Sequence, residues 1–211
     1  MSRAPSFCGV VLAAGESSRM GRDKALLPWP AAATAVPSGT LLSAHIELLQ
    51  PHSDLVIVVA GKNAEALQPI VDANAAFLAI NRQPERGQFS SLQVGLQEVL
   101  SRGRDAAIVA LVDHPPAQPR TLARLCNAFR DAWEQDKWAV IPEHGGRHGH
   151  PIVIGREMIE AFLRTPATST AREVLPVTRL GNHPVGGGRP GPVTSGLHAA
   201  YRARADRLSP G

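Results

Sequence analysis

Six short runs of apolar residues recur along the chain, and each shows little alternation between polar and apolar positions. A run of this kind is too short for most helices and is typical of a β-strand buried on both faces of a sheet. We therefore expect six strands. They lie at residues 7–14, 54–61, 77–81, 106–113, 138–143 and 150–155.

Between these runs lie four segments with a helical pattern, at residues 40–49, 64–71, 90–100 and 119–133. The last two carry apolar residues at three- and four-residue spacing and begin near a Ser or a Pro, as helices often do. Strands that alternate with helices predict crossover units, and hence a mainly parallel sheet covered by helices on both faces. The expected fold class is therefore α/β with three layers.

Two segments show no clear periodicity of apolar and polar positions. Residues 28–39 are rich in Pro and Ala, and we expect them to form a surface excursion before the helix that begins near Thr40. The tail at residues 180–211 is rich in Gly, Pro and Arg, and we expect much of it to be poorly ordered. The remaining residues, 1–179, are long enough to form one domain with a substantial core.

Composition narrows the classes of function. The net charge is +4 and the isoelectric point is near 9.7, but aromatic residues make up only 4% of the chain, so stacking platforms for nucleic acid are scarce. Binding of small anionic substrates would explain the net positive charge equally well. Cys8 and Cys126 offer neither a metal-binding spacing nor a disulfide framework, so we expect a reducing, cytoplasmic location. No apolar stretch approaches the roughly 18 residues of a membrane span.

The first apolar run leads into a loop that carries glycine, hydroxyl and cationic side chains. These are Gly15, Ser17, Ser18, Arg19, Gly21 and Lys24. Gly15 permits backbone angles that other residues avoid, and a serine here could cap a following helix, whose first N–H groups would suit an anion. Neither the Walker pattern nor the dinucleotide fingerprint is present. The alternative is a strand-to-helix turn with incidental surface cations.

A single carboxylate, Asp113, ends the apolar run that begins at residue 106. Ligands of parallel sheets bind beyond the carboxyl ends of the strands, so Asp113 and the loop after residue 14 are expected on one rim. A carboxylate in that place suits Mg²⁺, which prefers few protein ligands plus waters and phosphates. The alternative is an Asp that forms a turn before the helix at Pro119.

Two further segments are compatible with a ligand site. In ERGQFSSLQVGL, residues 85–96, Gly87, Ser90 and Ser91 either cap the helix that follows or face a ligand. In HGGRHGHP, residues 144–151, three histidines could bind zinc, but the cluster holds no Cys, Asp or Glu. The favoured interpretation is a loop that approaches a substrate with His150. The sequence contains no Gly-x-Ser-x-Gly motif, which would have indicated acyl transfer.

The loop and the segments after it resemble one known family. Residues 12–28, LAAGESSRMGRDKALLP, look like the opening motif of the MobA-like nucleotidyltransferases, L-A-A-G-x-S-x-R-M-G-x-x-K-x-L-L-P. Four later segments, GTLL, GQFSSLQVGL, LVDHPP and GGRHGHPIVIG, resemble motifs of the molybdenum cofactor cytidylyltransferase branch. Their order and spacing agree over residues 7–175.

This resemblance implies a Rossmann-like nucleotidyltransferase fold, and Mg²⁺-dependent attack by an acceptor phosphate on the α-phosphorus of CTP with release of pyrophosphate. It implies catalytic roles for Arg19 and Lys24 at the triphosphate and for Asp113 as the Mg²⁺ ligand, with His150 on the substrate side. The implied nucleotide-binding residues are Leu12, Ala13, Ala14, Gly15, Ser17, Arg19, Gly21, Lys24, Gly87, Ser90 and Ser91. The implied acceptor is a molybdopterin-type molybdenum cofactor, and a molybdoenzyme would receive the product.

Three departures from the family pattern matter. Phe89 stands in place of the first of three serines, so one polar contact near the nucleotide is lost or replaced by stacking. The excursion after Pro28 is longer than usual. The late metal-binding aspartate motif is missing, since Asp206 is the only acidic residue after Glu173, and Asn182 is at best a weak substitute. Three alternatives stay open: a nucleotide-binding or cofactor-chaperone protein without turnover, another phosphorylated acceptor, and the use of GTP.

Overall fold

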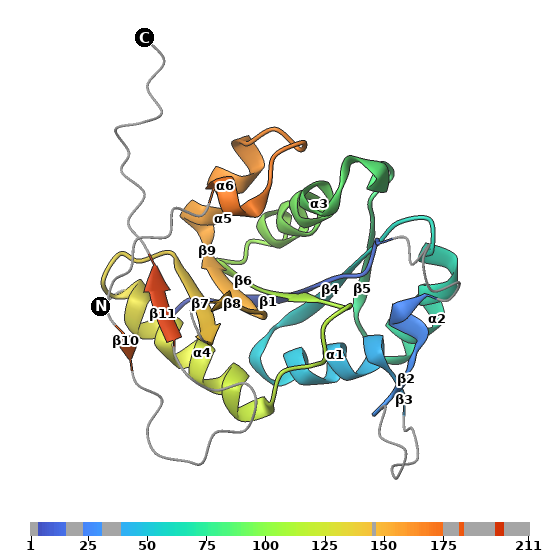
Figure 1. Cartoon of the computed structure of the whole chain (residues 1–211), viewed down its shortest axis with the longest axis horizontal. Helices are drawn as coiled ribbons and strands as arrows, with labels where there is room; N and C mark the ends of the chain where they lie inside the picture. Colours follow the sequence, from blue (N-terminus) through green and yellow to red (C-terminus); the bar gives the residue numbers. More distant parts are fainter. Residues whose placement is uncertain are drawn as a thin grey trace.

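The computed structural model describes residues 4–15, 23–30, 39–143 and 148–174, together with the backbone of residues 144, 147, 182–183 and 197–200 (Figure 1). All six expected strands are present. They are β1 (Phe7–Leu12), β4 (Leu55–Ala60), β5 (Phe77–Ile80), β6 (Ala106–Leu111), β7 (Ala139–His144) and β9 (Ile152–Gly155). The excursion after Pro28 is bounded by a small ladder between β2 (Pro28–Trp29) and β3 (Gly39–Thr40), and residues 31–38 within it lie outside the described parts.

These six strands belong to one sheet with the order β10-β11-β7-β9-β6-β1-β4-β5. Strands β6, β1, β4 and β5 are parallel neighbours, which confirms the mainly parallel core of the sheet. Strand β9 is antiparallel to both β6 and β7, because no crossover helix separates β7 from β9. The short strands β8 (Arg147–His148), β10 (Asn182–His183) and β11 (Leu197–Ala200) pair on the β7 side.

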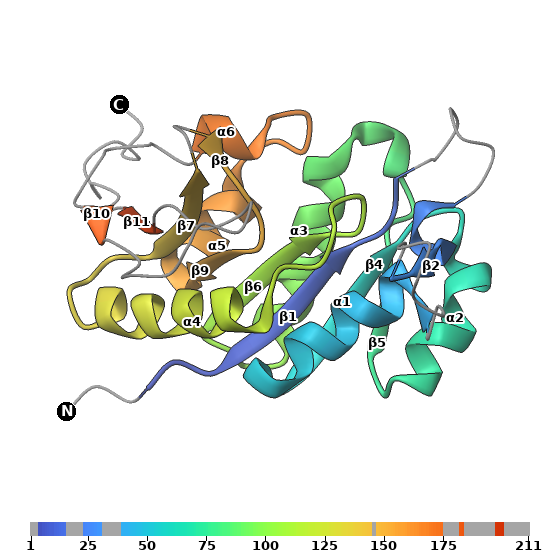
Figure 2. The same cartoon turned by 60° about the horizontal axis from the view of Figure 1, so that its bottom comes forward.

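Helices cover both faces of the sheet, as Figures 1 and 2 show, which confirms the three-layer α/β fold. They are α1 (Leu41–Leu49), α2 (Ala64–Ala73), α3 (Gln88–Ser101), α4 (Pro119–Trp133), α5 (Arg156–Arg164) and α6 (Ala171–Val174), with 3-10 turns η1 (Lys24–Leu26), η2 (Gln50–His52) and η3 (Pro84–Arg86). Among the described residues, no helix combines the length and the apolar character that crossing a membrane requires.

Alternate residues of β1 face the two helical layers. Phe7 and Val11 pack with the core beneath α1, α2 and α4, whereas Cys8 and Val10 pack with the core beneath α3 and α5. Both faces of this strand are therefore buried, which explains the unbroken apolar run. Burial raises the pKa of the Cys8 thiol, and that of Cys126 in the other core, to about 11, so both thiols are protonated core groups.

Helix α3 lies unusually close to the sheet at Gly95. A Cβ atom at this position would lie 2.7 Å from Cγ1 of Val10 in β1 and 2.9 Å from Cγ2 of Val59 in β4. Both distances are shorter than ordinary van der Waals contacts, so the missing side chain is what allows the approach. This close packing sets the height of the α3 amino terminus above the strand ends.

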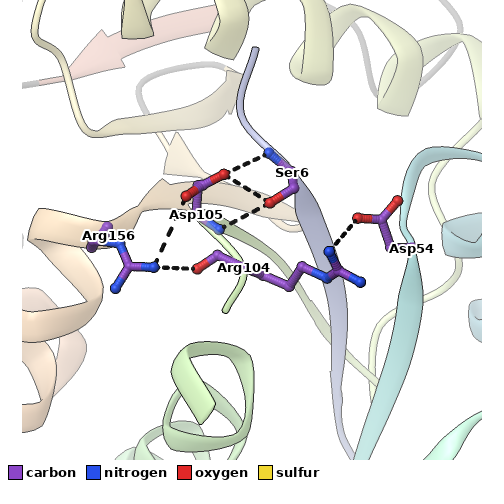
Figure 3. A network of polar contacts seen from close by, with 5 residues as sticks. All are labelled: Ser6, Asp54, Arg104, Asp105 and Arg156. Atoms are coloured by element: carbon purple, nitrogen blue, oxygen red, sulfur yellow. Dashed lines mark hydrogen bonds and ion pairs between the residues drawn. The ribbon is translucent and has the colours of Figure 1, made fainter. Parts of the chain in front are cut away.

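A polar network joins the amino ends of β1, β4 and β6 (Figure 3). Ser6 donates from its N–H and Oγ to Oδ2 of Asp105, at 3.1 and 2.8 Å. Arg156, which follows the antiparallel β9, donates to the Arg104 carbonyl at 3.1 Å, and Arg104 pairs with Asp54 at 3.4 Å. Charged residues at this end of the sheet thus contact one another.

Candidate functional site

A cavity of about 510 Å³ opens at the carboxyl ends of β1 and β6, the rim predicted from the sequence. It is lined by expected site residues from four separate segments: Leu12, Ala14, Gly15, Lys24, Gly87, Ser91 and Asp113. Residues that the sequence did not single out also line it: Asp23, Lys62, Pro84, Glu85, Gln88 and Val112. Because the segments are far apart in the sequence, only the folded sheet brings them together.

The backbone after β1 is held firmly as it enters the loop. The N–H of Ala13 donates to the Val59 carbonyl at 2.8 Å, so the chain stays hydrogen-bonded to β4 beyond the end of the strand. A Cβ atom at Gly61 would lie 3.0 Å from the Ala14 carbonyl oxygen, which shows how closely the turn after β4 approaches this backbone. Ala13 is 1% exposed and does not line the cavity. Ser17, Arg19 and Gly21 lie outside the described residues.

Lys24 and Asp113 meet across the cavity, with Nζ of Lys24 3.9 Å from Oδ2 of Asp113. Their side chains are 38% and 45% exposed, so solvent and ligands reach both. Lys24 begins the 3-10 turn η1, which Asp23 caps by accepting the N–H of Ala25 at 2.9 Å. The described part of the expected helix after the loop is thus one short turn, which presents Lys24 toward β6.

The serines at the start of α3 share one buried partner. Nδ2 of Asn81 donates to Oγ of Ser90 and Oγ of Ser91, both at 2.9 Å. Ser90 donates to the Gly87 carbonyl at 2.7 Å and borders a neighbouring hollow of about 720 Å³ rather than the cavity beneath Lys24. Gly87 has a φ of +99°, a left-handed conformation that favours glycine at this helix start. Of the two serines, Ser91 is the one that lines the cavity.

Phe89 does not stack in the cavity. It is 6% exposed, and its ring packs edge-on against Phe162 of α5 with ring centroids 5.7 Å apart. The suggestion that Phe89 replaces a lost serine contact by stacking on the nucleotide is therefore wrong. The side chain faces the core because α5 covers the same side of the sheet as α3 and provides an aromatic partner there.

Two histidines, His45 and His150, contact His114, the residue that follows Asp113. The ring of His150 packs edge-on against His114 with centroids 5.7 Å apart, so His150 lies beside the turn that carries Asp113 although it does not line the cavity. Burial, helped by His114, lowers the pKa of His150 to about 4 against the raising effect of Asp113. From the other side, Nε2 of the buried His45 contacts the His114 carbonyl at 2.9 Å, and burial lowers the pKa of His45. Both rings are therefore neutral near pH 7.

The zinc alternative gains no support. Among the side chains that the structure describes, which do not include that of His144, no three His, Cys, Asp or Glu groups are arranged to hold a metal ion. His148 instead lies 3.5 Å from a carboxylate oxygen of Glu143 across the β7–β8 pair.

The donors of the cavity fit Mg²⁺ rather than a metal that needs an all-protein cage. Three carboxylates line it, and Asp23 already accepts hydrogen bonds from Ala25 and Asn63. Asp113 is well exposed at the end of a buried strand, where one carboxylate plus waters and phosphate oxygens would complete the octahedral shell that Mg²⁺ prefers. The missing late aspartate cannot be placed, because Asp206 lies outside the described residues and only the backbone of Asn182 is described.

Comparison with known proteins identifies the family. The MobA-like NTP transferase domain matches residues 9–183. A probable molybdenum cofactor guanylyltransferase from Mycobacterium avium is 33% identical over 150 residues, covering 70% of this chain and 68% of the relative. The molybdenum cofactor cytidylyltransferase of Escherichia coli is 25% identical over 177 residues, covering 82% and 81%.

Solved structures agree with this assignment. A crystal structure of a Mycobacterium tuberculosis H37Rv protein superposes with a TM-score of 0.63 at 27% identity and covers 78% of both chains. A nucleotidyl transferase from Methanothermobacter shares the fold, with a TM-score of 0.59 at 24% identity and 75% coverage of both chains. The family match over residues 9–183 and the 33% identical relative show that the chain belongs to the MobA-like NTP transferase family.

Proposed function

We propose that this protein transfers CMP from CTP to a phosphorylated acceptor, a molybdopterin-type molybdenum cofactor, and releases pyrophosphate. The observation that carries the proposal is the cavity in which Lys24 and Asp113 meet at 3.9 Å beside the backbone of Gly15 and Gly87. A cation, a carboxylate and glycine turns at the carboxyl ends of parallel strands form a site for a metal-bound polyphosphate. Kinship with molybdenum cofactor guanylyl- and cytidylyltransferases supports the acceptor class.

In this reaction the protein mainly positions the reacting groups and neutralises charge. An oxygen of the acceptor phosphate forms a bond to the α-phosphorus, and the bond from that phosphorus to the oxygen bridging to the β-phosphate breaks, so its electron pair leaves with pyrophosphate. The nucleophile is already an anion, so no protein base is required. Lys24 and Arg19 would neutralise charge as it moves onto the leaving group, Lys24 as a compact ammonium and Arg19 as a two-pronged donor.

Asp113 would hold the metal in this scheme. Bound Mg²⁺ would supply positive charge to the triphosphate and to the departing pyrophosphate. The neutral ring of His150, behind Asp113, suits an acceptor that approaches from the side of β9 without adding a charge there.

CTP is proposed over GTP because GQFSSLQVGL resembles the cytidylyl branch and because its Ser91 lines the cavity. Several relatives at 33% identity are probable guanylyltransferases, which makes GTP the competing nucleotide. A second candidate function, nucleotide binding without turnover, is favoured by the single late carboxylate, Asp206, after Glu173.

Isothermal titration with CTP and with GTP, each with and without Mg²⁺, tests the proposal. Pyrophosphate release on addition of molybdopterin-type cofactor should follow in the same samples. Mg²⁺-dependent CTP binding with release supports the transferase, and release with GTP alone reverses the nucleotide assignment. Tight binding without release supports the second candidate function. If neither nucleotide binds, the assignment of the cavity fails.

A further inference from the structure

Asn63 is a residue of this region that the sequence patterns did not identify. It follows β4 and immediately precedes α2, and its side chain makes three hydrogen bonds to three segments. Nδ2 donates to the Ala13 carbonyl at 2.9 Å and to Oδ2 of Asp23 at 2.6 Å. Oδ1 accepts the N–H of Gly61 at 3.0 Å. One amide group thus joins the end of β1, the residue before Lys24 and the turn after β4.

The ordinary structural role of such an asparagine does not explain these contacts. Asn63 occupies the N-cap position of α2, where an Asn side chain usually accepts an N–H of the first helical turn. Here the side chain makes no capping hydrogen bond, and only the backbone carbonyl accepts from Leu67, at 3.2 Å. The side chain is turned away from its own helix and toward the loop after β1.

The two partners of Nδ2 lie on either side of that loop. Ala13 precedes Gly15, whose backbone lines the cavity, and Asp23 precedes Lys24, which also lines it. Asp23 uses its other oxygen to fix Ala25, so its carboxylate links Asn63 to the 3-10 turn that carries Lys24. The two hydrogen bonds that Asn63 donates therefore connect the loop entrance to the turn that carries the ammonium group.

Resting on the proposed function, we propose that Asn63 is a positioning residue that clamps both ends of the phosphate-binding loop and thereby sets Lys24 against the Gly15 backbone. Only an amide meets the demand, because two N–H donors and one acceptor are needed on one short side chain. A carboxylate of the same shape would oppose the Ala13 carbonyl and the Asp23 carboxylate with like partial charges. Small displacements of charged groups matter here, since transfer depends on alignment of the triphosphate.

Steady-state kinetics of the full chain test the clamp. Asn63→Ala should raise KM for CTP and lower kcat/KM by roughly 10- to 100-fold, and the isosteric Asn63→Asp should lower it further. Adding Asp23→Asn to Asn63→Asp restores the hydrogen bond between the two side chains with its direction reversed. The amide at position 23 then donates to the carboxylate at position 63. The double variant should therefore recover part of the kcat/KM lost by Asn63→Asp. Purely additive losses would overturn the proposed link between the two residues.

Asn74→Ala provides a matched control at the other end of α2, where Nδ2 of Asn74 donates to the Ile70 carbonyl at 2.8 Å. It also removes an amide from this helix, but far from the loop, and should leave KM for CTP unchanged. An equal rise in KM for Asn74→Ala and Asn63→Ala would mean that damage to α2, and not the clamp, is being measured.

Hydrogen exchange of the nucleotide-free protein separates failure of the clamp from failure of the proposed function. In Asn63→Ala, amides of residues 13–15 and 23–27 should exchange faster than in the wild type, by roughly 10-fold, while those of β6 and α4 keep their rates. If the wild type lacks turnover but this local change occurs, the clamp holds and the proposed reaction is wrong. Unchanged exchange beside the loop, or faster exchange throughout the chain, overturns the clamp.

Discussion

Lys24 and Asp113 both keep a substantial part of their side chains exposed, and their ion pair spans 3.9 Å. An exposed pair of this kind contributes roughly 0–1 kcal/mol to stability, because solvent screens both charges. The pair at the strand ends is therefore expected to matter more for ligand binding than for folding. The same residues that stabilise the fold little are the ones expected to matter most to turnover.

Replacing Lys24 by Ala should separate these two effects. We expect kcat/KM for CTP to fall by about 10²- to 10³-fold, as for loss of one donor to a transition-state anion, while the free energy of unfolding changes by less than about 1 kcal/mol. Pyrophosphate-release kinetics and urea unfolding measure the two quantities. Lys137→Ala is the control, since Lys137 is a half-buried lysine that does not line the cavity and whose Nζ contacts Gln135 at 2.7 Å; it should change neither. Loss of stability equal to the loss of activity would contradict the assignment.

At the scale of elements, the position of α3 is set by a single missing side chain. Methyl groups of Val10 and Val59 lie only 2.7 and 2.9 Å from where a Cβ of residue 95 would be, and both side chains are β-branched with restricted rotamers, so neither moves aside readily. The helix can approach β1 and β4 only because residue 95 is glycine. Its amino terminus, with Gly87 and Ser91, reaches the cavity as a consequence.

Gly95→Ala should therefore destabilise the protein despite the better helix propensity of alanine. Overpacking costs typically 1–3 kcal/mol, and propensity returns about 1 kcal/mol, so we expect a net loss of up to roughly 2 kcal/mol. Urea unfolding provides the measurement. Gln97→Ala, on the exposed side of the same helix, gains propensity without a clash and should not destabilise. A Gly95→Ala protein as stable as the wild type would mean that α3 shifts without cost.

Strands and long helices were predictable because burial leaves a local pattern. The run at Phe7 is apolar at every position since both faces of β1 are covered. Helix α5 was missed although Met158, Ile159 and Phe162 recur at helical spacing, because the helix follows β9 directly without a loop. The antiparallel direction of β9 could not be predicted, since strand order depends on contacts between distant segments.

The candidate site divides in the same way. Gly15, Lys24 and Asp113 belong to contiguous motifs at strand ends, and the parallel sheet brings them to one rim as expected. Asn63 and Asp23 act through hydrogen bonds between separate segments, which no local pattern encodes. The direction of Phe89 was equally beyond reach, because it depends on where Phe162 packs.

At the scale of the whole molecule, the two ends of the sheet carry different polar chemistry. At the amino ends of β1, β4 and β6, hydrogen bonds and ion pairs connect five polar residues: Ser6, Asp54, Arg104, Asp105 and Arg156. At the carboxyl ends, Lys24 and Asp113 line the cavity, and the neutral rings of His45 and His150 contact His114 beside Asp113. Because these rings stay uncharged in the folded protein, the free energy of unfolding should depend on pH.

The pKa of His150 is about 4 in the fold, against 6.5 for the unperturbed side chain. Below about pH 6.5, His150 binds a proton in the unfolded chain but stays neutral in the folded protein. The free energy of unfolding should therefore fall as the pH drops and should level off near the folded pKa. The lowered pKa of His45 acts in the same direction. We expect His150 alone to account for a loss on the order of 1–3 kcal/mol between about pH 7 and pH 4.5, measured by urea unfolding.

Comparison with His150→Gln isolates this contribution. Ionisable groups that do not contact residue 150 keep the same surroundings in both proteins, so their effects cancel in the difference between the two pH dependences. The variant should therefore lose less stability on acidification than the wild type, whatever its stability at neutral pH. If both proteins lose the same free energy, His150 accepts a proton in the fold as readily as in the unfolded chain. Its burial beside His114 would then not keep the ring neutral.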